Sequence, residues 1–130
     1  MMINTMKTAM IIASDAGART AGIIREELGK EVDLFSVSER SGCVRIDSIT
    51  DFTLRHFGDY EAFVFIGAMG ICVRAIAPCV TSKYADPAVV NVDATGHFVV
   101  SVLAGHVGGA NALTERLARI LGAQPVVTTQ

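Results

Sequence analysis

The sequence has few charged residues, and their signs nearly balance. Charged side chains make up 18% of the 130 residues, with 11 basic and 13 acidic residues and a formal net charge of -2. Such a chain has no whole-molecule attraction for nucleic acid or for an anionic membrane surface. Any anionic ligand must therefore be bound by a local group of basic residues.

Long hydrophobic runs are also missing. No apolar segment approaches the roughly 20 residues that a membrane-spanning helix needs. The first residues lack the basic block and the apolar block that mark a secretory signal. We therefore expect a soluble cytoplasmic protein without nucleic-acid or membrane partners.

Cysteine is scarce, and the common sequence marks of metal and hydrolase sites are absent. Cys43, Cys72 and Cys79 form no CxxC pair and have no histidine at metal-ligand spacing, which predicts reduced thiols. There is no HExxH motif, no GxSxG motif and no cluster of His, Asp and Glu at ligand spacing. The sequence thus predicts neither a resident metal nor a resident cofactor.

Hydrophobic side chains, by contrast, are abundant. They make up 51% of the chain, and the mean hydropathy is +0.45, which suits a large core and argues against disorder. The length suits one compact domain, residues 1–130, that needs no metal or disulfide for stability. Within it we expect residues 1–6 to be a poorly ordered start.

Short apolar runs alternate with segments of helical spacing. The runs predict strands at 8–13, 32–37, 62–66, 88–92, 97–102 and 125–129, and the periodicity predicts helices around 21–28, 49–57, 71–76 and 113–121. The turn sequence Asp93-Ala94-Thr95-Gly96 predicts an antiparallel hairpin. We therefore predict an α/β fold, a three-layer α/β/α domain of Rossmann-like or flavodoxin-like type, whose sheet is mostly parallel but mixed because of this hairpin.

Two glycine-rich junctions each connect a strand to the helix that follows it. The first contains Gly67 and Gly70, and the second contains Gly105, Gly108 and Gly109. In open α/β sheets ligands bind at the carboxyl ends of strands, where glycine permits close approach and a helix start offers N–H groups to an anion. Both junctions are therefore candidate cradles for a carboxylate or phosphate. The alternative, that the glycines serve only tight turns and helix–sheet packing, is equally open.

Polar side chains in these junctions are the candidate ligand contacts. His106, at the predicted start of the last helix, is the candidate acid–base group, unless it only caps a turn. Asn111 can cap that helix or bind a ligand carbonyl. Arg74 follows Gly70 by four residues and could pair with a bound carboxylate, or it could be a solvated helix arginine.

Five further residues have simpler interpretations. Lys83 and Asp86 lie in a polar connection that is long enough to fold over a pocket. Asp93 most simply starts the hairpin turn. His56 and His97 have no neighbours in the sequence that suggest catalysis, so we expect structural or surface roles for both.

Three blocks of the sequence carry a family resemblance. Residues 67–78 are GAMGICVRAIAP, residues 82–93 are SKYADPAVVNVD, and residues 101–111 are SVLAGHVGGAN. In the same order they resemble the patterns G-A-x-G-I-x-V-R-x-I-A-P, D-K-x-x-D-P-A-V-V-V-x-D and S-L-L-S-G-H-x-G-G-A-N of the CbiG family, the cobalt-precorrin-5A hydrolases of anaerobic cobalamin biosynthesis. Ser82 and Ala104 depart from these patterns, and the resemblance covers most of the chain from Phe63 onward.

The resemblance implies a reaction. Enzymes of this family open the ring-A δ-lactone of cobalt-precorrin-5A with water and release acetaldehyde, giving cobalt-precorrin-5B, and the cobalt is carried by this anionic tetrapyrrole substrate. Such chemistry needs a base, donors for an oxyanion and cations for the substrate's carboxylates. We therefore expect His106 to be catalytic, and we expect the substrate-binding residues to be Gly67, Gly70, Arg74, Lys83, Asp86, Gly105, Gly108, Gly109 and Asn111.

The resemblance also implies a missing partner. Family members continue into a C-terminal domain similar to CobE, which this chain lacks, so the substrate could bind between the two domains. A non-catalytic module that binds or delivers corrinoid intermediates is the main alternative function, and a phosphate-binding domain is a more distant one. The oligomeric state stays open, with a homodimer as one option.

Overall fold

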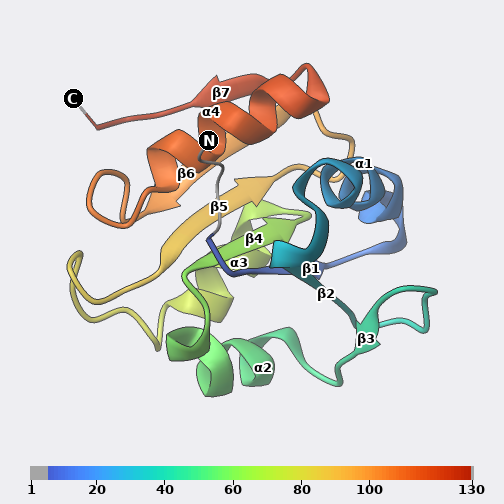
Figure 1. Ribbon diagram of the computed structural model, residues 1–130. Coiled ribbons are helices and arrows are strands. Elements are labelled where there is room, and N and C mark those ends of the chain that lie inside the picture. The colour runs from blue at the N-terminus through green and yellow to red at the C-terminus, as the bar shows by residue number, and fades with distance from the viewer. Residues whose placement is uncertain (1–5, 130) are drawn as a thin grey trace.

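The computed structural model describes residues 6–129, and these form one mixed sheet with helices on both faces (Figure 1). Seven strands lie in the order β3-β2-β1-β4-β5-β6-β7. Their bounds are β1 (Thr8–Ile12), β2 (Val32–Ser36), β3 (Val44–Arg45), β4 (Ala62–Ile66), β5 (Ala88–Val92), β6 (Phe98–Leu103) and β7 (Gln124–Val126). The expected poorly ordered start falls on residues 1–5, which lie outside the described residues, and on Met6, which packs partly buried against the core.

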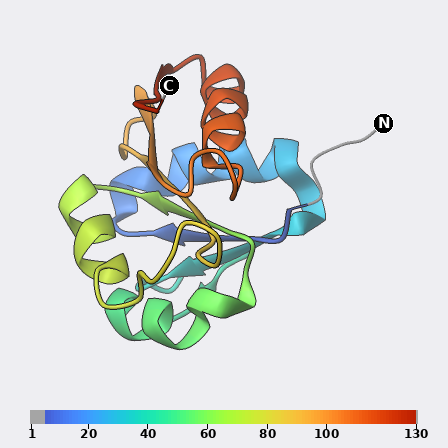
Figure 2. The same cartoon turned by 90° about the vertical axis from the view of Figure 1, so that its left-hand side faces the viewer.

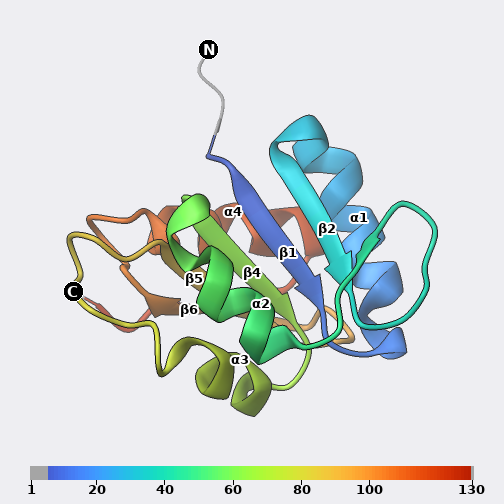
Figure 3. The same ribbon diagram turned by 90° about the horizontal axis from the view of Figure 1, so that it is seen from below.

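The helices divide equally between the two faces of the sheet. In Figure 2, α1 and α4 lie on one side of the sheet and α2 and α3 on the other, and Figure 3 shows α2 and α3 in front of the strands. Their bounds are α1 (Ala18–Leu28), α2 (Ile49–His56), α3 (Met69–Ile76) and α4 (Ala110–Leu121), with short 3-10 turns η1 (Asp15–Gly17), η2 (Gly29–Glu31) and η3 (Phe57–Asp59). The predicted three-layer α/β fold is confirmed. None of the helices within residues 6–129 has the length and apolar character needed to cross a bilayer.

The central strand β4 shows why the sequence contains continuous apolar runs. All five of its residues are buried. Val64 and Ile66 join the core beneath α1 and α4, whereas Phe63 and Phe65 join the core beneath α2 and α3. A strand covered on both faces must be apolar at every position, and each buried side chain of this size contributes roughly 1.5–3 kcal/mol.

The direction of the strands changes at the predicted hairpin. Strands β1 to β5 run parallel to one another. Strand β6 is antiparallel to β5, and β7 is parallel to β6. The pairing of Val92 with Val99 and of Val89 with Leu103 places the end of β6 beside the start of β5. The hairpin prediction is confirmed, and it decides where the loop after β6 lies.

The Asp93 carboxylate holds the hairpin turn together. Its Oδ1 accepts the backbone N–H groups of His97, at 2.8 Å, and of Phe98, at 2.6 Å, and its Oδ2 accepts the N–H and the hydroxyl of Thr95. Burial alone would raise the pKa of Asp93, but these hydrogen bonds outweigh it and lower that pKa below its ordinary value. The expectation that Asp93 starts the turn is confirmed.

Replacing Asp93 by asparagine is expected to destabilise the fold in a pH-dependent way. Because the pKa of Asp93 is lower in the folded state, its contribution is present above the unfolded value of about 4 and is lost as the pH falls through the folded value. We expect the free energy of unfolding to fall by about 1 kcal/mol at pH 7, and we expect this difference from the wild type to shrink between roughly pH 5 and pH 3. Urea unfolding across this range measures it, with the exposed Asp47→Asn variant as control. An equal loss at both ends of the range would contradict the assignment.

Several boundaries differ from the sequence predictions by one to three residues, and one strand was not predicted. Strand β3 was not expected, because it has only two residues and both are exposed, so no apolar pattern marks it. The last strand ends at Val126, whereas the apolar run continues to Val127. Helix α4 begins at Ala110, which leaves His106 in the preceding loop.

Candidate functional site

The two glycine-rich junctions lie at opposite ends of the sheet. Gly67 follows β4, where the parallel strands end, and its N–H donates to the carbonyl of Val92 at 2.8 Å. Gly105 follows β6, which runs the other way, so the second junction lies beside Ala88 at the start of β5. A five-residue strand spans about 13 Å between these ends, at about 3.3 Å per residue. The two junctions are therefore separate, and the second does not lie at the carboxyl ends of the parallel strands, where the sequence analysis expected a ligand to bind.

The first junction is tightly packed. Gly67 has a φ of 155°, and a Cβ there would lie 2.7 Å from the Cβ of Ala13, so a side chain would not fit. The carbonyl of Gly67 accepts a hydrogen bond from the Asn91 side chain at 3.2 Å. Gly70 lies inside the first turn of α3, and the guanidinium of the exposed Arg74 lies 3.4 Å from the place of its missing Cβ. Close packing accounts for Gly67, whereas a side chain at Gly70 would meet only the movable guanidinium of Arg74.

The second junction is a compact loop, residues 104–109, between β6 and α4. Two backbone hydrogen bonds close it, from the Ala110 N–H to the Ala104 carbonyl at 3.1 Å and from the Asn111 N–H to the Gly105 carbonyl at 3.0 Å. Ala104 has a φ of +59°, in the left-handed region that an alanine rarely adopts. A Cβ on Gly108 would lie 2.5 Å from the Ala104 Cβ. The fold therefore holds this loop in a strained conformation, which is common at functional sites.

Asn111 braces the loop from behind. Its Oδ1 accepts the Ser101 hydroxyl at 2.7 Å, and its Nδ2 donates to the Thr129 hydroxyl. The residue before the first turn of α4 is Gly109, so Asn111 does not cap the helix. Because both ends of its amide already have protein partners, Asn111 ties β6, α4 and the C-terminal segment together.

Asp86 organises the loop that carries Lys83. Its buried carboxylate accepts the N–H of Thr81 at 2.9 Å, the hydroxyl of Thr81 at 2.8 Å and the N–H of Ser82 at 3.1 Å. These bonds bend residues 81–86 into a turn that exposes Lys83, whose Nζ lies 5.4 Å from the centre of the Tyr84 ring. Asp86 thus shapes the loop, and Lys83 is the side chain that the loop presents to solvent.

The two loops meet at a cavity of about 270 Å³. Figure 1 shows them on the same side of the molecule, the segment after β6 in orange and the connection before β5 in yellow. The residues that line the cavity are Lys83, Ala104, Gly105, His106, Val107 and Thr129. Among the described residues, its lining thus includes an ammonium group and an imidazole but no carboxylate, a combination that can attract an anion and move a proton.

His106 is not where the sequence placed it. Three residues separate it from Ala110, the first residue of α4, and its side chain is exposed. The expectation that it lies at the helix start, where the dipole would hold the imidazole neutral, is wrong, because this effect fades beyond the first turn. Its place in the cavity beside Lys83 still gives it access to a ligand. Among the described residues, no group of three or more His, Cys, Asp or Glu side chains is placed to hold a metal ion.

The free backbone donors of the loop are its third feature. Within the part of the chain that the structure describes, the N–H groups of Gly108 and Gly109 donate to no protein acceptor. Gly108 also borders a neighbouring hollow of about 400 Å³ together with Met6, Tyr60 and Glu61. Sequence reasoning therefore found Lys83, Gly105 and His106, which the structure brings together, but it also grouped them with Gly67, Gly70 and Arg74, which lie at the far end of the sheet.

Comparisons with known proteins agree on one relationship. The sequence model of a family described as Cobalamin synthesis G N-terminal matches residues 51–130. A protein named cobalt-precorrin-5A hydrolase from Salmonella typhimurium is 59% identical over 73 residues, which are 56% of this chain and 21% of that protein. Its namesake from Priestia megaterium is 49% identical over 73 residues, 56% of this chain and 20% of that protein.

A solved structure extends the likeness to the whole fold. It is described as a cobalamin biosynthesis protein G homolog from Sulfolobus solfataricus, and it matches with a TM-score of 0.75 at 26% identity. The match covers 95% of this chain but 38% of the solved chain. The chain thus spans about a fifth of the curated relatives and under half of the structural one.

Proposed function

Because the chain belongs to the Cobalamin synthesis G N-terminal family, we propose that it is the N-terminal part of a cobalt-precorrin-5A hydrolase. In this proposal the complete enzyme opens the ring-A δ-lactone of cobalt-precorrin-5A with water and releases acetaldehyde, giving cobalt-precorrin-5B. The cobalt arrives within the substrate, so the reaction needs no resident cofactor. The enzyme would act in the cytoplasm, with the further length of the relatives supplying a partner domain.

The observation that carries the proposal is the cavity between the two loops. Lys83 and His106 are far apart in the sequence, yet they line the same space. Both belong to blocks that resemble the family patterns, and Asp86 and Asn111, in the same blocks, brace the two loops. This arrangement supports a site for an anionic substrate at this end of the sheet.

The proposed roles follow from the chemistry of each group. His106 takes a proton from the water that attacks the lactone carbonyl, since an imidazole is the side chain that most often acts as a general base in enzymes. The N–H groups of Gly108 and Gly109 are the candidate donors for the oxyanion that forms there. Lys83 pairs with a peripheral carboxylate of the substrate.

Arg74, Gly67 and Gly70 are not part of this proposed site. They lie where β4 ends, whereas the cavity lies near the start of β5. A role for Arg74 in binding substrate would need a second contact at the opposite end of the sheet. We therefore rank Lys83 above Arg74 as the cation for the reacting part of the ligand.

A domain exchange tests the proposal. The part of the Salmonella typhimurium hydrolase from its start to the end of the 73-residue matched segment is replaced by this chain, and acetaldehyde release from cobalt-precorrin-5A is followed with a coupled dehydrogenase assay. We expect turnover within about tenfold of the unaltered hydrolase, because the two proteins are 59% identical over the matched residues. A folded chimera that binds the substrate but releases no acetaldehyde would argue against the proposal and for the alternative, a module that binds or delivers corrinoid intermediates.

The observation that favours this alternative is the small share of the relatives that the chain spans. A binding domain could supply affinity while another part of the enzyme supplies the catalytic base. The two functions differ in one measurement, since His106 is needed for turnover in the first and dispensable for it in the second.

A further inference from the structure

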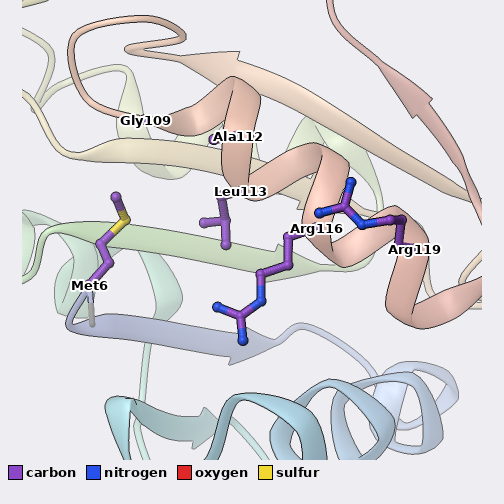
Figure 4. A pocket seen from close by; sticks show the side chains of 6 residues that line it. All are labelled: Met6, Gly109, Ala112, Leu113, Arg116 and Arg119. Atoms are coloured by element: carbon purple, nitrogen blue, oxygen red, sulfur yellow. The ribbon is translucent and has the colours of Figure 1, made fainter. Parts of the chain in front are cut away.

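A second cavity lies directly beside the candidate loop, on the face of the sheet that α1 and α4 cover. It measures about 320 Å³ and is lined by Met6, Gly109, Ala112, Leu113, Arg116 and Arg119. Figure 4 shows Met6 and Leu113 on its walls, with both arginine side chains reaching from α4. Gly109 is the last residue of the loop 104–109, and residues 104–107 of the same loop line the cavity at His106.

The lining combines apolar walls with two guanidinium groups. Met6, Ala112 and Leu113 supply hydrocarbon surface. Within residues 6–129, neither Arg116 nor Arg119 forms an ion pair or a hydrogen bond through its side chain, whereas Arg40, Arg45 and Arg55 each pair with an aspartate. The cavity therefore presents two cations without a partner anion.

Arg119 lies where an ion pair within the helix would be expected. Glu115 lies four residues before it, the spacing and order at which ion pairs form best on a helix, yet no such pair exists in the structure. Instead Arg119 and Arg116, three residues apart on one face, both line the cavity. Two like charges at this spacing repel each other by a few tenths of a kcal/mol. A carboxylate bound between them would remove the repulsion and accept charge-assisted hydrogen bonds from both.

We propose that this cavity is an anchoring subsite for an organic carboxylate with an adjoining apolar part, held by Arg116 and Arg119 against Met6 and Leu113. If the proposed function holds, the occupant is a peripheral carboxylate arm of the tetrapyrrole, bound beside the loop that carries His106. The preference for a carboxylate rests on the residues that line the cavity. The assignment of that carboxylate to the tetrapyrrole rests on the proposed function.

Titration with uroporphyrin I, a tetrapyrrole with eight carboxylates, tests the subsite without any turnover. Fluorescence gives the dissociation constant for the 130-residue chain, for Arg116→Gln, for Arg119→Gln and for the double variant. We expect each single variant to bind about tenfold to 100-fold more weakly and the double variant to bind more weakly still, since each variant loses a charge-assisted hydrogen bond. Arg55→Gln, on the opposite face of the sheet, is the matched control and should bind like the wild type.

Side-chain NMR tests whether uroporphyrin I binds at these two arginines. The Nε–H signals of Arg116 and Arg119 should shift as uroporphyrin I is added, while that of Arg55 should stay in place. Unchanged affinity in the double variant, or no binding by the wild-type chain, would overturn the proposal. The domain exchange fails or succeeds independently, because a chimera without acetaldehyde release leaves the binding measurement unaffected.

Discussion

Replacing His106 by alanine in the domain-exchange enzyme should lower acetaldehyde release about 100-fold to 10,000-fold, the range that a general base contributes. The physical reason is that, among the described residues that line the cavity with Lys83, His106 has the side chain that most often acts as a general base in enzymes. Substrate binding should change little, because Lys83 and the glycine N–H groups remain. The measurement is the initial rate of acetaldehyde formation at saturating substrate.

Two companion variants separate catalysis from structure. His106→Gln keeps a hydrogen-bonding side chain but no base, so it should be as slow as His106→Ala. His97→Ala is the matched control, since His97 is also exposed but lies at the hairpin turn, where it contacts Thr95. Undiminished turnover by His106→Ala would remove the imidazole from the mechanism and leave binding as the role of this chain.

Replacing Asp86 by alanine should destabilise the fold by about 2–4 kcal/mol. The carboxylate is buried and accepts three hydrogen bonds, from the N–H and hydroxyl of Thr81 and from the N–H of Ser82. Its removal leaves two backbone N–H groups without an acceptor near the start of β5, and hydrogen bonds to a charged group are the costly ones to lose. Urea unfolding followed by circular dichroism measures the loss.

Asparagine at this position gives a graded test. Its single carbonyl oxygen can accept at most two of the three hydrogen bonds, so Asp86→Asn should lie between wild type and Asp86→Ala in stability. Asp47→Ala is the control, because Asp47 is exposed and its pair with Arg45 is a surface ion pair that contributes little. If the free energy of unfolding of Asp86→Ala lies within about 0.5 kcal/mol of the wild-type value, Asp86 does not organise the loop.

Most of the fold could be predicted because burial leaves a direct mark on the sequence. The apolar run of β4 and the helical spacing of α4 correspond to positions that the structure buries. The turn from Asp93 to Gly96 was recognisable because its residue types favour such turns. Strand β3 has neither mark, since two exposed residues carry no periodicity.

The site was harder to predict than the elements that carry it. The blocks that contain Lys83 and His106 were recognised separately, but their meeting depends on the register of β5 with β6, which no local pattern encodes. The separation of Arg74 from His106 could have been found, because an antiparallel hairpin sends the loop after its second strand to the start of the first. The pair Arg116 and Arg119 was missed for a different reason. Two arginines three residues apart look like an ordinary solvated helix face until Met6 closes the space beside them.

The place of β1 in the sheet has a consequence for how the chain assembles. This strand pairs with β2 on one side and with β4 on the other, and its contact between Thr8 and Ala62 joins residues 54 positions apart. The centre of the sheet therefore closes only after a long loop has been ordered, and such a non-local pairing makes folding slower than in a helical bundle of local contacts. During synthesis the backbone groups on one edge of β1 therefore stay unpaired until the ribosome has released β4. The segment that the family model matches, residues 51–130, thus depends for its folding on a strand outside the match.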